Sequence, residues 1–154
     1  MRRVLITGMS GTGKSSALSQ LTARGFDVVD TDDPGWTEWS DEDGGYLWVE
    51  DRMAALLDKP VSTGLFVSGA TSNQVKFYSR FDAIVLLSAP VDVLAERIRT
   101  RTTNRYGKSA AEMEQIRRHV KDVEPLLRRA CTHEIDAREP LAIVVNRLAE
   151  LAGP

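Results

Sequence analysis

The sequence has very little sulfur or imidazole: its 154 residues include one cysteine, Cys131, and two histidines, His119 and His133. A lone cysteine cannot form an internal disulfide, and no Cys/His cluster of the kind that binds zinc is present. No apolar run approaches the roughly 20 residues of a membrane-spanning helix. These absences argue against a disulfide scaffold, a zinc module and a membrane span.

A strong charge of either sign is also lacking. The 20 basic and 22 acidic residues leave a formal net charge of −2, which gives no general attraction to nucleic acid or to an anionic membrane. Met1-Arg2-Arg3 runs directly into a strand pattern, which leaves no room for a signal peptide. We therefore expect one cytoplasmic domain over residues 1–154, monomeric or homodimeric, whose partner is a small molecule.

Basic residues are absent from one long stretch, between Asp27 and Asp51, which holds ten acidic residues. A phosphorylated or carboxylated ligand would be repelled there. Trp36, Trp39 and Trp48 lie in the same stretch. They either form a stacking wall for a sugar, a base or a cation, or belong in part to the core.

One strong motif is present, Gly8-Met9-Ser10-Gly11-Thr12-Gly13-Lys14-Ser15, which matches G-x-x-x-x-G-K-[ST] at every fixed position. It lies between an apolar strand pattern and a helical pattern, the context that a P-loop requires. Glycines let the backbone curl and aim its N–H groups at phosphate. Lys14 would neutralise β/γ-phosphate charge, and Ser15 would ligate Mg²⁺. The alternative, a glycine-rich turn before a helix, does not account for the Lys-Ser pair. The nucleotide-binding residues predicted here are Gly8, Ser10, Gly11, Thr12, Gly13, Lys14, Ser15 and Ser16.

The rest of the chain alternates between strand and helix patterns. Strands are predicted at about 3–7, 26–30, 64–68, 83–88 and 133–136, and helices at 14–23, 46–57 and 90–101, with others starting near 109, 125 and 140. Such alternation predicts an α/β fold with a parallel sheet flanked by helices. Ligands of such sheets bind at the carboxyl ends of the strands.

Carboxylates follow the second predicted strand. Alternation places Asp30 and Asp32 on the same side of the chain. Beside a P-loop, this pair suits holding Mg²⁺ and orienting or deprotonating an acceptor hydroxyl. The alternative is a solvated acidic turn, which we prefer for Asp33. No carboxylate follows the apolar run at 64–68, where Ser68-Gly69 stands instead, which argues against ATPases that take a metal ligand from that strand.

Arginines cluster after the fourth predicted strand. Arg97 and Arg101 share one face of the helix at 90–101, and Arg105 follows in a polar loop at about 102–108. Arginine can stack on adenine and grip phosphate bidentately, and a basic loop can close over a triphosphate as a lid. The alternative is a solvated basic face.

With these motifs together, the chain resembles small P-loop kinases of the shikimate kinase and adenylate kinase type over nearly its whole length. Asp30-Thr31-Asp32 is similar to the D-x-D of shikimate kinases, in which the first Asp serves Mg²⁺ and the second the acceptor. Glu96 to Arg101 resembles the adenylate kinase pattern, in which one arginine stacks on adenine and the next touches phosphate. The resemblance implies the P-loop NTPase fold, with sheet order 2-3-1-4-5, a lid at about 102–108, and an adenine loop that includes Arg138 and Pro140.

The acceptor side departs from that family. Two arginines that shikimate kinases use for the substrate carboxylate are missing, one near Tyr46–Glu50 and one near Val123–Leu126. We therefore predict an ATP- and Mg²⁺-dependent phosphotransferase whose acceptor is a neutral or cationic hydroxyl compound bound at about 32–58. Lys14, Asp32 and Arg101 would be its catalytic residues, and Ser15 and Asp30 its metal ligands. Two alternatives stay open: a nucleoside or nucleotide kinase, and an ATP-binding regulatory switch with little transfer activity.

Overall fold

The computed structural model describes residues 2–102 and 104–153; the ends of the predicted domain, 1 and 154, and residue 103 of the predicted lid lie outside the described residues. Its centre is a five-stranded parallel sheet of order β2-β5-β1-β6-β7. The strands are β1 (Arg3–Thr7), β2 (Asp27–Asp30), β5 (Leu65–Ser68), β6 (Ala83–Ser88) and β7 (His133–Asp136). Counted within this sheet, the order is the predicted 2-3-1-4-5. The P-loop NTPase-like fold is thus confirmed.

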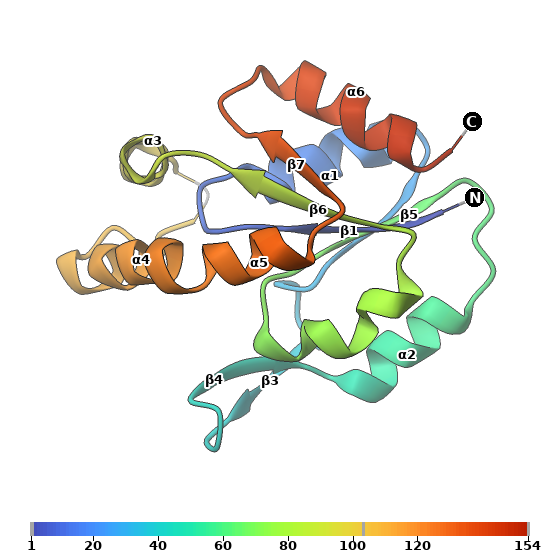
Figure 1. Cartoon of the computed structure of the whole chain (residues 1–154), viewed down its shortest axis with the longest axis horizontal. Coiled ribbons are helices and arrows are strands. Elements are labelled where there is room, and N and C mark those ends of the chain that lie inside the picture. Colours follow the sequence, from blue (N-terminus) through green and yellow to red (C-terminus); the bar gives the residue numbers. More distant parts are fainter. Residues whose placement is uncertain (1, 103, 154) are drawn as a thin grey trace.

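Helices cover both faces of the sheet (Figure 1). One layer contains α1 (Lys14–Ala23) and α6 (Leu141–Leu151), and the other contains α2 (Glu50–Asp58), the 3₁₀ helix η1 (Ser72–Arg80) and α5 (Glu124–Ala130). In β1, Val4 and Ile6 belong to the core cluster that includes α1 and α6, whereas Leu5 belongs to the cluster that includes α2 and η1. Successive strand residues face opposite layers, so an apolar run is needed where both faces are buried.

Two further helices, α3 (Val91–Thr100) and α4 (Ala110–Asp122), lie beyond the carboxyl edge of the sheet, at the left in Figure 1. Helix α4 begins as its sequence predicts: the Ser109 hydroxyl accepts a hydrogen bond from the Glu112 amide at 3.1 Å. The Glu112 carboxylate accepts from the Ser109 hydroxyl and the Gly107 amide, so the capping box is only half formed. In the described ranges, no helix is long and apolar enough to cross a membrane.

The sequence prediction was wrong between residues 37 and 49. Two antiparallel strands, β3 (Thr37–Ser40) and β4 (Gly45–Trp48), form a hairpin there, and α2 starts at Glu50 instead of near Tyr46. Gly44, with φ +67°, closes the turn by donating its amide to the Ser40 carbonyl at 2.8 Å. Trp48 is buried with 2% exposure next to α2, whereas Tyr46, two residues earlier on the same face of β4, is 63% exposed near the turn. Aromatic residues spaced by two favour a strand over a helix.

The hairpin is joined to the main sheet by two buried side-chain amides at the start of η1, those of Asn73 and Gln74. Asn73 accepts from the Trp48 amide and donates to the Trp48 carbonyl, both at 3.0 Å, and donates to Glu50 at 3.1 Å. Gln74 donates to the Thr7 hydroxyl at 3.1 Å, next to the P-loop. Because a two-stranded hairpin is only marginally stable by itself, these bonds fix its base.

We expect Asn73→Ala to destabilise the protein by about 1–3 kcal/mol, because it leaves both main-chain polar groups of buried Trp48 without these partners. Thermal unfolding measures the change. The control is Ser79→Ala on the exposed side of the same helix, for which we expect a change within about 0.5 kcal/mol. Equal stability of the two variants would contradict the assigned role of Asn73.

Candidate active site

The loop between β1 and α1 wraps tightly against the rest of the fold. Gly8 has φ +147°, and a Cβ there would lie 2.4 Å from the Leu87 carbonyl oxygen of β6, so no other residue fits. Buried Thr12 holds the turn by donating its hydroxyl to the Met9 carbonyl at 2.9 Å. The loop thus reaches α1 with Gly13 as its N-cap, which leaves the first N–H groups of the helix directed at the solvent side.

Lys14 folds back over this loop. Its Nζ donates to the carbonyls of Gly8 at 2.6 Å and Met9 at 3.1 Å. Burial lowers the pKa of Lys14 to about 8, although the nearby Asp32 and Asp30 carboxylates act in the opposite direction. A cation held only by neutral carbonyls is available to an anionic group that arrives at the loop.

The two predicted carboxylates meet the P-loop from β2. Ser15 donates its hydroxyl to Asp30 Oδ2 at 2.9 Å, and Asp30 Oδ1 accepts from the Asp32 amide at 3.0 Å. Partial burial, followed by the Asp30 charge, raises the pKa of Asp32, while Lys14 lowers it. A raised pKa makes a carboxylate a better proton acceptor once it is ionised.

The predicted arginines lie on the other side of the loop. Arg97 donates to the Gly11 carbonyl at 3.3 Å and to the Ala137 carbonyl at 2.5 Å, so it bridges the P-loop and the segment after β7. Arg101 donates to the carbonyls of Asn104 at 3.0 Å and Tyr106 at 2.6 Å, and burial lowers its pKa. Arg101 therefore shapes the start of the predicted lid.

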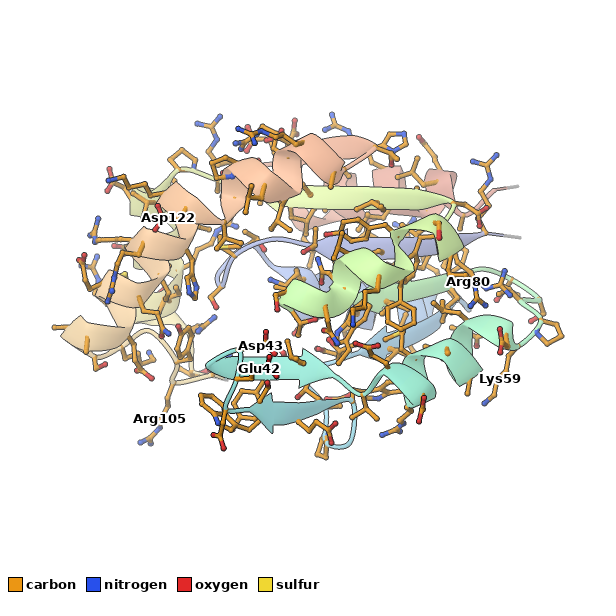
Figure 2. The ribbon with its side chains drawn as sticks, turned by 60° about the horizontal axis from the view of Figure 1, so that its bottom comes forward. Glu42, Asp43, Lys59, Arg80, Arg105 and Asp122 are labelled. Atoms are coloured by element: carbon orange, nitrogen blue, oxygen red, sulfur yellow. The ribbon has the colours of Figure 1, made fainter. Side chains whose placement is uncertain are left out.

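These groups surround one cavity of about 380 Å³. Ten predicted site residues line it: Ser10, Gly11, Thr12, Gly13, Lys14, Ser15, Ser16, Asp32, Arg97 and Arg101. Five predicted residues do not: Gly8, Asp30, Arg105, Arg138 and Pro140. Gly8 and Asp30 instead contact residues that do. Arg105 is exposed and projects outward (Figure 2).

The segment after β7 lines the cavity with other residues than the two that the prediction named. Arg138 pairs with Asp136 at 2.7 Å, which lowers the pKa of Asp136 to about 2, and its exposed side chain points to solvent. Lining residues that the sequence prediction missed are Asn104, Ala137, Glu139, Leu141 and Val144. Four of them adjoin predicted residues in the sequence, which was the available signal: Asn104 adjoins Arg105, Ala137 and Glu139 adjoin Arg138, and Leu141 adjoins Pro140. The Glu139 amide donates to the Asp136 carbonyl at 3.2 Å, which closes a tight turn in this segment.

The three tryptophans of the acidic stretch have different environments. Trp48 is in the core and its ring contacts Phe77, with centroids 5.8 Å apart. Trp36 lies under the Arg52 guanidinium at 4.0 Å. Trp39 is 55% exposed and packs edge-on against Tyr46. Of the three, Trp39 and Trp48 line a second cavity, which lies between the β3–β4 hairpin and the start of α2.

Comparisons with known proteins agree with this geometry. A family model described as an AAA domain matches residues 4–118. A search of curated proteins found no match. Three similar structures are a shikimate kinase from Acinetobacter baumannii in complex with shikimate (18% identity, TM-score 0.65, 98% of this chain and 92% of that one), a sugar kinase from Janibacter sp. HTCC2649 (20%, 0.64, 100% and 96%) and a gluconokinase from Sinorhizobium meliloti 1021 (26%, 0.58, 98% and 93%).

The similarity to shikimate kinases spans nearly the full length of both chains, which confirms the predicted resemblance to small P-loop kinases. These three similar structures are kinases by name. The chain belongs to the AAA domain family and has the fold of the small P-loop phosphotransferases.

Proposed function

We propose that the protein transfers the γ-phosphoryl group of ATP, with Mg²⁺, to a hydroxyl of a small neutral or cationic molecule. The observation that carries this proposal is the convergence of Lys14, Ser15 and Asp32 on one cavity, with Asp30 bonded to Ser15 behind them. Phosphoryl transfer needs little covalent chemistry from the protein, so positioning and charge stabilisation are the functions to assign.

The donor half is assigned to the P-loop and the arginines. Main-chain N–H groups of Gly11 to Ser15 would bind phosphate oxygens, and Lys14 would leave the Gly8 carbonyl to pair with the transferring group. Arg101 would add a second positive charge at the same cavity. Arg97, Ala137 and Leu141 would border the base.

The metal assignment is supported by the donor set. Ser15 and Asp30 offer hard oxygen ligands 2.9 Å apart, and Mg²⁺ is commonly bound by one or two protein oxygens together with phosphates and waters. Among residues 2–102 and 104–153, no group of three acidic, histidine or cysteine side chains forms a complete metal cage, in keeping with that mode. When bound, Mg²⁺ would neutralise charge on the phosphates.

The acceptor chemistry is assigned to Asp32. The acceptor oxygen forms a bond to the γ-phosphorus while the bond from that phosphorus to the bridging oxygen breaks, and Asp32 takes the hydroxyl proton. A carboxylated acceptor such as shikimate is disfavoured by the acidic stretch between Asp27 and Asp51. Nucleosides and nucleoside monophosphates, and a regulatory switch, remain the competing proposals. Turnover at about 1–100 s⁻¹ with a neutral or cationic alcohol that is not a nucleoside, and none with nucleosides or nucleoside monophosphates, would separate ours from both.

Lys14→Met should reduce ADP formation from ATP, measured with a panel of alcohols, by at least about 100-fold. The fold should persist, because the substitution removes a partly buried charge held only by carbonyls. The matched control is Lys59→Met, an exposed lysine distant from the loop (Figure 2), which should keep full activity. Normal turnover in Lys14→Met would disprove the proposed role.

Nucleotide affinity should depend on pH through Lys14. Its pKa is about 8 in the free protein, and bound phosphate favours the protonated form, which raises that pKa. Affinity is therefore full below pH 8 and falls as pH rises from 8, by up to about tenfold per pH unit until the raised pKa is passed. Calorimetric titration between about pH 7 and 9.5 measures this; Lys14→Arg, which keeps its charge, should show a flat profile.

Asp32→Asn should lower kcat by about 10²–10⁴-fold while the Kd for nucleotide stays within about threefold, because only the proton acceptor is lost. Asp33→Asn is the matched control, since Asp33 does not line the cavity. Equal kcat values for the two variants would remove Asp32 from the reaction.

A further inference from the structure

The cavity of about 380 Å³ at the P-loop has two ends that differ in chemistry. Lys14, Asp32 and Arg101 lie together at the end formed by the loop, since the charges of the other two act on the pKa of Lys14. The other end is formed by the turn after β7 and the start of α6, which contribute Ala137, Glu139, Leu141 and Val144. Figure 1 shows this turn at the same edge of the sheet as α3 and the loop after β1. Phosphates on the P-loop would leave the second end for the nucleoside.

Glu139 is an unexpected residue in the wall of a cavity for a polyanion. Its carboxylate repels phosphate, which keeps the phosphates at the P-loop end. Leu141, Val144 and Arg147 follow one another at intervals of three on α6, so they lie along one side of that helix. Arg147 donates to Glu139 Oε1 at 3.5 Å and so holds the half-buried carboxylate next to the side of α6 that lines the cavity. Glu139 Oε2 accepts no hydrogen bond from any described residue.

The other side chains at this end cannot accept a hydrogen bond. Those from the turn and from α6 are apolar, apart from Glu139 itself. Arg97 is only a donor, and its two terminal nitrogen atoms already donate to the Gly11 carbonyl at 3.3 Å and the Ala137 carbonyl at 2.5 Å. Among the described lining residues at this end, Glu139 is therefore the side chain that can distinguish the donors of a base edge from its acceptors.

We propose that Glu139 binds the exocyclic amino group of the nucleotide base and thereby selects the nucleoside triphosphate. An ionised carboxylate only accepts hydrogen bonds, so it favours an edge with an amino group over an edge that presents lone pairs. The 6-amino group of adenine meets this requirement. The assignment rests on the proposed binding of a nucleoside triphosphate at this cavity, and it adds the group by which the base is recognised.

The test compares ATP with purine riboside triphosphate, which has a hydrogen atom in place of the 6-amino group. Dissociation constants for the full chain are measured by calorimetry in EDTA, so that no nucleotide is consumed. We expect ATP to bind about tenfold more tightly, a difference equal to about 1.4 kcal/mol, because its amino group donates to a charged acceptor. Equal affinities of the two nucleotides would overturn the proposal.

Variants assign this ratio of affinities to one side chain. Glu139→Ala should bring the ratio to within about twofold, whereas Glu150→Ala, which removes the same charge from an exposed position of α6 outside the cavity, should keep it. The ratio is the readout because loss of either carboxylate also changes the attraction of the protein for a polyanion. Glu139→Gln keeps an uncharged acceptor of the same shape, so its ratio should be about threefold. A ratio that stays at about ten in either Glu139 variant would contradict the assignment.

A ribose hydroxyl is the competing donor for the same carboxylate, and 2′-deoxy-ATP tests it. We expect removal of the 2′-hydroxyl to change the affinity by the same factor in the unaltered protein and in Glu139→Ala. A loss of affinity that disappears in Glu139→Ala would assign the carboxylate to the ribose and overturn its assignment to the base.

Phosphoryl transfer from both purine nucleotides to a panel of alcohols is measured separately with Mg²⁺. If Glu139 favours ATP in binding but no alcohol is phosphorylated, the base assignment stands and the phosphotransferase proposal fails. If alcohols are phosphorylated with equal kcat/KM from both nucleotides, the phosphotransferase proposal stands and the base assignment fails.

Discussion

The contact between the Lys14 ammonium and the carbonyls of Gly8 and Met9 is the interaction on which the site depends. It places a positive charge inside a loop whose shape is already fixed by Gly8 against β6 and by Thr12 on Met9. The cost of this partly buried charge appears as the lowered pKa of Lys14. An anionic ligand would relieve that cost, because charge-assisted bonds to phosphate are stronger than bonds to neutral carbonyls.

The other residues of the candidate site are arranged around this lysine by the topology of the sheet. Neighbouring parallel strands end at one edge, so Asp30 and Asp32 from β2 meet the loop that follows β1. Arg97 closes the other side by linking Gly11 to Ala137. The hairpin is anchored to the same edge through Asn73 and Gln74, the latter bonded to Thr7 one residue before Gly8. The hairpin and the P-loop are therefore linked through the start of η1.

The apolar runs predicted the strands of the sheet, and the glycine motif predicted the loop between β1 and α1, whereas the order of the strands followed from the resemblance to small P-loop kinases. The sequence was insufficient for the hairpin, where the β-favouring residues Tyr46, Leu47 and Trp48 also fit a helical pattern that continues into α2. It also placed Arg138 and Pro140 at the cavity, whereas a tight ion pair with Asp136 turns Arg138 outward. Asn73 and Gln74 are polar residues whose burial depends on the position of the hairpin, so local pattern alone could not assign them.

The account is tested most directly by a crystal structure of the protein with Mg²⁺ and a non-hydrolysable ATP analogue. We predict that the phosphates lie on the N–H groups of Gly11 to Ser15 and that Lys14 Nζ has moved from the Gly8 and Met9 carbonyls to a phosphate oxygen. An analogue bound elsewhere, or a Lys14 that still donates to Gly8 with the loop occupied, would contradict the central role assigned to this lysine.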